Sequence, residues 1–149
     1  MTKVSQVMTE NPVSCLAGDS ISSVTQQMQI HDVGAVPVVS DHETKKLIGI
    51  VTDRDIALRV VGADRDVKGT WVADVMTPNP VACHANDNID LAIEAMSLHR
   101  VRRIPTVDDS GQLVGIISQA DVATRLHDTH KTADIVTEIS QPNSIQMPR

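Results

Sequence analysis

The stretch VSQVMTENPVSC at residues 4–15 returns later in the chain as VADVMTPNPVAC at residues 72–83. The matching register continues through the pairs Asp19/Asp87, Met28/Met96 and Pro37/Pro105, and after a two-residue deletion resumes at Gly49/Gly115 and Asp55/Asp121. The match extends almost to His127. Each copy is longer than one repeat of a solenoid, so the sequence predicts a small fold that has been duplicated and fused.

Both copies carry the same pattern of predicted elements, in the order β-α-β-β-α. The first copy has a short apolar helix or turn at residues 4–8, strands at 13–16, 35–39 and 47–51, and helices after Ser20 and after Thr52. Asp19 or Ser20 is a suitable helix cap, and Ile21, Val24 and Met28 follow it at helical spacing. In the second copy the strands are predicted at 81–83, 104–107 and 113–117, with helices at 89–99 and after Ser118.

The repeat length predicts how the copies are organised. One copy of roughly 60 residues buries too little surface to be stable on its own. We therefore expect an α+β protein of α/β type, in which the two repeats pack face to face by pseudo-two-fold symmetry and enclose a pair of related clefts. The predicted boundaries are 1–62 for the first repeat, 63–70 for a linker, 71–128 for the second repeat and 129–149 for a flexible C-terminal tail.

Composition excludes several classes of function. The chain has one Trp, no Tyr and no Phe, so a nucleic-acid site built on aromatic stacking is disfavoured. The net charge of −6 also argues against nucleic-acid binding. Two cysteines are too few for a disulfide framework, and no apolar run is long enough to cross a membrane. We expect a cytoplasmic protein without a nucleic-acid or membrane partner.

The first candidate site is GIVTDRD at residues 49–55, echoed by GIISQAD at residues 115–121. A hydroxyl residue follows a buried strand, and a carboxylate comes three residues later. One interpretation is a capping box, in which Thr52 and Asp55 satisfy the first amides of a helix. The other is a ligand site, in which Thr52 offers its hydroxyl to a phosphate while Asp55 accepts hydrogen bonds from a ribose diol. The residues alone leave both open.

The second candidate is HRVRR at residues 99–103, the densest positive cluster of the chain. Arginine is well suited to bidentate phosphate binding, although cations are also favoured at an exposed helix end. The first repeat has HDVGA at residues 31–35, without an arginine. If the cluster binds phosphate, this difference means that only one of the two clefts is equipped for an anion; the residues alone leave both interpretations open.

Other reactive side chains give weaker signals. Cys15 and Cys83 occupy matching strand positions, where they serve either as small buried hydrophobes or as a redox pair. The histidines show no ligand spacing, and Cys83–His84 alone does not define a metal site. No nucleophile stands beside a base, so we expect neither catalysis nor a bound metal.

The duplication and both Gly-hydrophobic-hydrophobic-Thr/Ser-x-x-Asp motifs resemble the CBS domain in its tandem arrangement, the Bateman module, over residues 3–127. The Asn-Pro-Val strand entry and the strands VPVV and IPTV add to the resemblance. The chain looks like the stand-alone prokaryotic members. The resemblance implies a non-catalytic regulatory module that requires no cofactor, binds AMP, ADP, ATP or a related adenosyl compound as its regulatory ligand, and forms a disc-shaped homodimer.

The resemblance also implies two ligand sites, each shared between the repeats. The first joins residues of both repeats, namely Thr52, Arg54, Asp55, Asn79, His84, His99, Arg100, Val101 and Arg102. The second and weaker site joins Asn11, Leu16, Val33, Gly34, Ser118 and Asp121. Asp32 stands where the first site has Arg100, and Gln119 and Ala120 replace the charged residues of the first motif.

A rival interpretation from another class is a ligand-free scaffold. In that case the two motifs serve only as helix caps, and the homodimer binds a protein partner that the sequence does not identify. Binding of an adenosyl nucleotide distinguishes the two interpretations.

Overall fold

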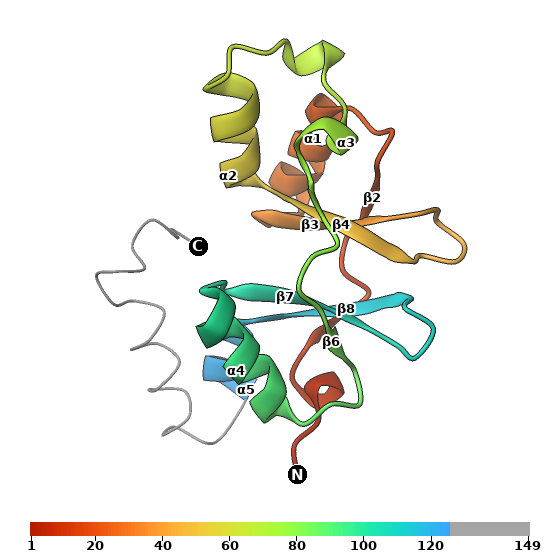
Figure 1. The fold of residues 1–149 in the computed structure, drawn as a ribbon, viewed down its shortest axis with the longest axis vertical. Helices are drawn as coiled ribbons and strands as arrows, with labels where there is room; N and C mark the ends of the chain where they lie inside the picture. Colours follow the sequence, from red (N-terminus) through yellow and green to blue (C-terminus); the bar gives the residue numbers. More distant parts are fainter. Residues whose placement is uncertain (126–149) are drawn as a thin grey trace. The chain divides into compact units, whose positions relative to one another are not determined.

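The computed structural model describes residues 1–125 and divides them into two compact units (Figure 1). The α1 unit, named here after its longest helix, comprises Pro12–Pro80 and Ser110–Leu113. The α4 unit comprises Met1–Asn11, Val81–Asp109 and, within the described residues, 114–125. The tail predicted at 129–149 and the end of the repeat predicted at 71–128 lie outside the described residues.

The α1 unit is a four-stranded mixed sheet covered by helices. The sheet order is β2-β3-β4-β5, with β2 (Cys15–Leu16) parallel to β3 (Ala35–Val39), and β4 (Leu47–Thr52) antiparallel to both β3 and β5 (Thr77–Pro78). The helices are α1 (Ile21–His31), α2 (Asp53–Ile56), which continues as the π-helical turn η2 (Ala57–Val61), the 3₁₀ turn η3 (Val67–Gly69), and α3 (Val72–Val75).

The α4 unit repeats this plan. Its sheet order is β1-β8-β7-β6, from β1 (Thr9–Glu10), β8 (Leu113–Ser118), β7 (Arg103–Val107) and β6 (Cys83–His84). Strand β1 pairs antiparallel with β8, while β6 pairs parallel with β7. The helical elements are η1 (Val4–Gln6), α4 (Ile89–His99) and α5 (Gln119–Arg125).

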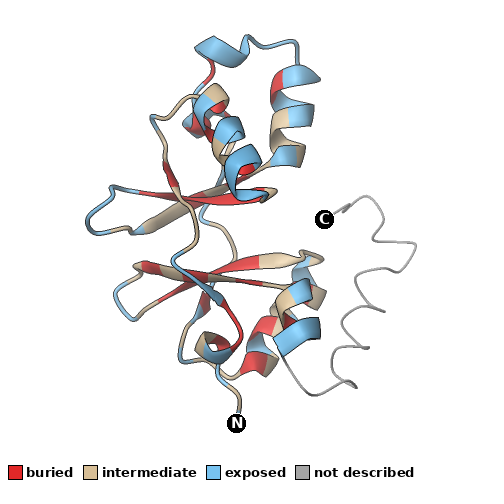
Figure 2. Cartoon of the chain, turned by 180° about the vertical axis from the view of Figure 1, so that it is seen from behind, coloured by how far each residue is buried: buried red, intermediate tan, exposed pale blue. Residues whose placement is uncertain are grey.

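Local sequence signals account for the helices and strands. Ser20 caps α1 by accepting a hydrogen bond from the Ser23 amide, and Ile21, Val24 and Met28 are buried along one face, as the spacing predicts. Every residue of β3 is buried, whereas buried residues alternate along β8 (Figure 2). A continuous run of buried residues is typical of a strand that is covered on both faces. Alternation of buried and partly exposed residues is typical of a strand that is covered on one face.

The compact units differ from the sequence repeats, because Ser110–Leu113 of the second repeat belongs to the α1 unit and the first segments of the two repeats are exchanged. Residues 3–11 of the first repeat complete the α4 unit, and residues 71–79 of the second repeat complete the α1 unit; we call these two stretches the crossover segments. Val4, Val7 and Met8 belong to the core of the α4 unit, while Val72 and Val75 belong to the core of the α1 unit. Sequence reasoning predicted the apolar helices in these segments but not the exchange.

The stretch predicted as a linker also has structure. It contains η3, and the Ile21 amide donates to the Thr70 carbonyl at 3.0 Å. Thr70 is buried, and its hydroxyl donates to the Asp66 carbonyl at 2.7 Å. The end of this stretch is therefore packed at the start of α1.

Glycines at matched positions allow the crossover segments to approach the sheets. A Cβ on Gly115 would lie 2.5 Å from Met8 Sδ, 2.7 Å from Thr106 Oγ1 and 2.9 Å from the Thr9 carbonyl oxygen. On Gly49 it would lie 2.8 Å from Met76 Sδ and 3.1 Å from the Thr77 carbonyl oxygen. Both positions require glycine because a neighbouring backbone lies close: β1 pairs with β8 at Gly115, and β5 pairs with β4 at Gly49.

Gly115→Ala is expected to lower the free energy of unfolding by at least about 1 kcal/mol, because the new methyl group overlaps a strand backbone that is fixed by pairing. Gly18→Ala is the matched control, since a Cβ there meets nothing within 4 Å. Urea denaturation of both variants measures the difference. Equal stabilities would contradict the close approach of β1.

Candidate functional site

The end of β4 and the start of α2 form the capping box that the sequence predicted. The Thr52 hydroxyl accepts a hydrogen bond from the Asp55 amide at 3.1 Å, and the Thr52 amide donates to Asp55 Oδ2 at 2.9 Å. The side chain of Asp55 is only 15% exposed. Its carboxylate is therefore held in one orientation, with Oδ1 still able to accept further hydrogen bonds.

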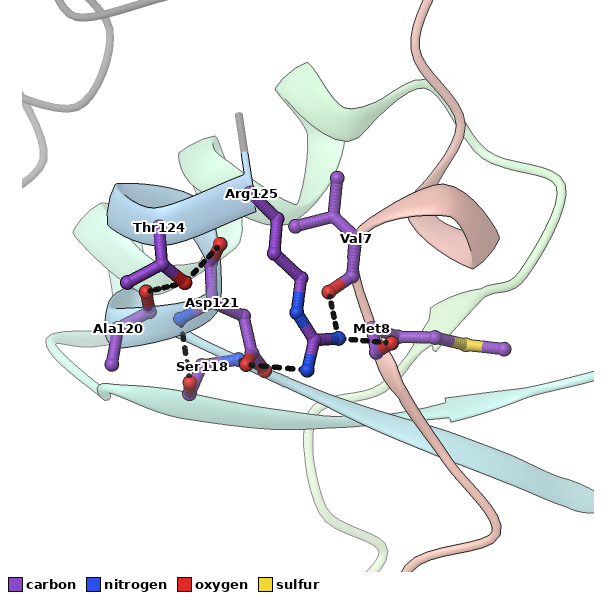
Figure 3. Close-up of polar contacts among 7 residues, drawn as sticks. All are labelled: Val7, Met8, Ser118, Ala120, Asp121, Thr124 and Arg125. Atoms are coloured by element: carbon purple, nitrogen blue, oxygen red, sulfur yellow. Dashed lines mark hydrogen bonds and ion pairs between the residues drawn. The ribbon is translucent and has the colours of Figure 1, made fainter. Parts of the chain in front are cut away.

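The second repeat forms the same box at the end of β8 (Figure 3). The Ser118 hydroxyl accepts from the Asp121 amide at 3.0 Å, and the Ser118 amide donates to Asp121 Oδ2 at 3.0 Å. The two motifs thus match in geometry as well as in sequence.

An arginine that sequence reasoning missed lies one helical turn after each carboxylate. Arg59 Nε is 3.9 Å from Asp55 Oδ1, and an Arg125 nitrogen is 3.9 Å from Asp121 Oδ1. The i,i+4 spacing of acid and base on a helix was the available signal. What the spacing does not reveal is the second contact of each arginine, which goes to the backbone of a crossover segment.

The start of β3 lies beside the first capping box. Ala35 is paired with Thr52, and the Gly34 carbonyl accepts from the Asp53 amide at 2.9 Å. The α1 unit thus brings Thr52 and Asp55 next to Val33 and Gly34. Arg54 lies in the first turn of α2 and is half-buried.

The equivalent place in the α4 unit carries the arginine cluster. The Gln119 amide donates to the Arg102 carbonyl at 2.8 Å, which brings Val101 and Arg102 next to Ser118. Arg102 and its neighbours Arg100 and Arg103 are half-buried and make interactions of their own. The cross-repeat sharing predicted above, in which Thr52 and Asp55 work with Val101 and Arg102, stays a prediction.

The helices α1 and α4, which precede Val33 and Val101, both end at a residue in the left-handed conformation. Asp32 and Arg100 end α1 and α4 with φ of 53° and 54°. The following amides of Val33 and Val101 reach back to the Met28 and Met96 carbonyls, as in a Schellman motif. His99, the last residue of α4, is exposed.

The remaining predicted site residues lie farther along the strands. The backbone amide of Asn79 donates to the Ile48 carbonyl at 3.1 Å, and the backbone amide of Asn11 donates to the Val114 carbonyl at 3.3 Å. Four strand positions separate Ile48 from Thr52, roughly 13 Å. Leu16 and His84 end the short strands β2 and β6. Asn79 therefore lies at the opposite end of β4 from the capping box.

The cysteines are buried, as expected of small hydrophobes. Burial, with a smaller contribution from Asp19, raises the pKa of the Cys15 thiol to about 12. Burial, with a smaller contribution from Asp87, raises the pKa of Cys83 to about 11. Both thiols are free and stay protonated at neutral pH, which makes them poor nucleophiles.

Residues 1–125 lack two other features that would bear on function. These residues contain no group of three or more His, Cys, Asp or Glu side chains that could hold a metal ion. None of their helices is long and apolar enough to cross a membrane.

The chain is a tandem α/β module of two repeats that exchange their first segments. Each unit has a four-stranded sheet, and a hydroxyl–carboxylate capping box follows β4 in one unit and β8 in the other. The sequence model of the CBS domain matches residues 4–62 and 72–128. The chain belongs to the CBS domain family, as its motifs predicted.

Two bacterial relatives match this chain over nearly their whole length. The CBS domain-containing protein YhcV of Bacillus subtilis is 35% identical over 143 residues, covering 96% of this chain and 99% of YhcV. Hypoxic response protein 1 of Mycobacterium tuberculosis is 30% identical over 146 residues, covering 97% and 99% of the two chains.

Solved structures of CBS pairs are similar in fold. The CBS domain protein PAE2072 from Pyrobaculum aerophilum, complexed with AMP, matches with a TM-score of 0.79 and 25% identity over 89% of this chain and 99% of that one. The CBS domain pair of protein MJ0100, in complex with 5′-methylthioadenosine and S-adenosyl-L-methionine, matches with a TM-score of 0.73 and 26% identity over 83% and 94%.

Proposed function

We propose that this chain is a non-catalytic regulatory module that binds an adenosine nucleotide, with Asp55 as the acceptor of the ribose hydroxyls. The observation that carries the proposal is the fixed Asp55 carboxylate in a fold shared with CBS pairs that hold AMP or adenosyl compounds. A half-buried, oriented carboxylate with an oxygen still able to accept suits a diol, which offers two hydroxyl donors. The ligand needs no cofactor and acts by binding two states of the module with different affinity.

The arginine cluster supports a phosphate group as part of the ligand. Arg100 and Arg102 of the second repeat have no basic counterpart at Asp32 and Gly34 of the first. We propose that the phosphate of the first ligand is bound by His99, Arg100 and Arg102, and that the ligand bridges the repeats. The second set, around Ser118 and Asp121, is proposed as the weaker site.

We also propose that the module works as a cytoplasmic homodimer. Apolar side chains exposed on its helices support an interface between copies, and they are Ile30, Leu58, Val61, Leu91 and Leu98.

Saturable AMP binding is the expected result that tests this function. AMP at about 100 times its Kd should raise the free energy of unfolding by about 2.7 kcal/mol. Thermal denaturation with AMP, ADP, ATP and S-adenosylmethionine measures this, with guanosine monophosphate as the control for non-specific anion effects. Equal midpoints with and without every adenosyl compound would contradict the proposal.

The second candidate is a ligand-free scaffold, and one observation favours it. Thr52 and Asp55 already satisfy each other's amides, so the motif is complete as a helix cap without a ligand. The same titrations decide between the two functions.

A further inference from the structure

Arg59 contacts two separate parts of the α1 unit. Its Nε faces Asp55 Oδ1 at 3.9 Å, and its NH1 group donates to the Val75 carbonyl at 3.0 Å. Val75 is the last residue of α3, in the crossover segment 71–79. One guanidinium thus joins the predicted ribose carboxylate to a segment that comes from the other repeat.

The α4 unit contains the same connection (Figure 3). Arg125 pairs with Asp121 Oδ1 and donates from NH1 to the carbonyls of Val7 and Met8 at 3.0 and 2.8 Å. Val7 and Met8 belong to the crossover segment 3–11. The arrangement therefore occurs twice, each time between the motif carboxylate and the end of the helical turn in the exchanged segment.

Each crossover segment leads along the chain from one unit into the other. Segment 71–79 pairs with β4 through β5, and its next residues lead into the α4 unit. A displacement of the end of α3 is consequently passed along a short, extended piece of chain. Because α3 is a single turn, such a displacement also reaches Trp71 at its start.

The geometry at Asp55 makes the contact sensitive to a ligand. Oδ2 already accepts a hydrogen bond from the Thr52 amide, which leaves Oδ1, the oxygen that faces Arg59, as the more available acceptor for a ribose hydroxyl. The Arg59 Nε, at 3.9 Å, is too far from Oδ1 for a hydrogen bond, so the contact is an ion pair, and a hydroxyl donor on Oδ1 would weaken its attraction. The ion pair is long, at 3.9 Å, and the Arg59 side chain is 54% exposed, so moving Arg59 away from Asp55 costs little free energy.

We propose that Arg59 is a positioning residue that couples Asp55 to the crossover segment, so that a ligand on the carboxylate moves α3; Arg125 does the same for Asp121 and η1. This inference rests on the proposed function for its ligand, but the Asp55–Arg59–α3 coupling can be measured without one. The readout is Trp71, the only aromatic residue of the chain and half-exposed.

The first experiment uses acrylamide quenching of Trp71 in the full chain without nucleotide. Arg59→Met and Asp55→Asn should each raise the quenching constant, and the double variant should raise it no further than the larger single effect, because both remove one connection. Arg59→Lys should lie between wild type and Arg59→Met, since one ammonium does not reproduce the fork. Asp121→Asn and Arg125→Met remove the matched charges in the other unit and should leave Trp71 unchanged.

The second experiment adds AMP. In wild type, AMP should change the Trp71 emission. In Arg59→Met, AMP should bind with the wild-type affinity or up to about fivefold more tightly, because no guanidinium contact has to be disturbed, and the emission change should be lost. An emission change in Arg59→Met equal to wild type overturns the coupling, as do additive effects of Asp55→Asn and Arg59→Met on quenching. If wild type binds no adenosyl compound, the proposed function fails, and the quenching data still decide whether Arg59 couples Asp55 to α3.

Discussion

Removal of residues 1–11 is expected to unfold the α4 unit, although every other described residue of that unit belongs to the second repeat. The segment supplies the buried side chains of Val4, Val7 and Met8 and the edge strand β1. Each buried side chain contributes about 1.5–3 kcal/mol, so the loss approaches the whole stability of a small domain, about 5–15 kcal/mol. The α1 unit has its own core and should keep its fold.

Limited proteolysis with mass spectrometry measures this outcome directly. Cleavage should become fast within residues 81–125, while Trp71 emission reports that the α1 unit remains folded. Thr9→Ala and Glu10→Ala are the controls, because both side chains are exposed in the same segment. A synthetic peptide of residues 1–13, added in trans, should restore protection. Truncated protein as resistant as the intact chain would show that the segment is dispensable.

The elements with strong local signals were predicted closely. Helix α4 spans the predicted residues 89–99, and α1 begins directly after the predicted cap Ser20. Both depend on apolar spacing and on capping side chains within the same few residues, which is why sequence alone defines them. The shorter strands were less exact: β2 begins at Cys15 and β6 at Cys83, later than predicted, because few pairing residues define them.

The exchange of the crossover segments could not be predicted for a physical reason. Val4 and Val7 correspond to Val72 and Val75, so either segment offers the same apolar face to either sheet. The choice depends on the path of the chain in three dimensions. The close glycines were visible in sequence, but the strand that each one accommodates was not.

The candidate site was likewise predictable from the sequence only in part. The capping boxes follow from a hydroxyl and a carboxylate three residues apart, and the structure confirms both. The contact from Arg59 to the Val75 carbonyl joins residues distant in sequence and has no sequence signature. The ligand role of Asp55 stays a prediction, because the same atoms that would hold a ribose also cap a helix.

Asp55→Ala is therefore the decisive substitution for the site, with Asp121→Ala as its matched partner. Both remove an acceptor from a capping box and the partner of an arginine at 3.9 Å, so both should cost similar stability. Only Asp55 belongs to the set proposed to include Arg100 and Arg102. We expect Asp55→Ala to weaken AMP binding by about 1–3 kcal/mol, roughly 5- to 150-fold, because it removes the acceptor of both ribose hydroxyls.

Asp121→Ala should weaken AMP binding much less at the tighter site. Calorimetric titration of wild type and both variants measures the affinities, and thermal midpoints show whether the two substitutions perturb folding equally. A comparison with 2′-deoxy-AMP adds a second test, since loss of a ribose hydroxyl should reduce affinity in wild type and have little further effect in Asp55→Ala. If Asp121→Ala weakens binding as much as Asp55→Ala, both carboxylates contribute equally, and the assignment of the tighter site to Asp55 is wrong. If neither variant changes the affinity, the two carboxylates serve as helix caps alone, and AMP is bound elsewhere.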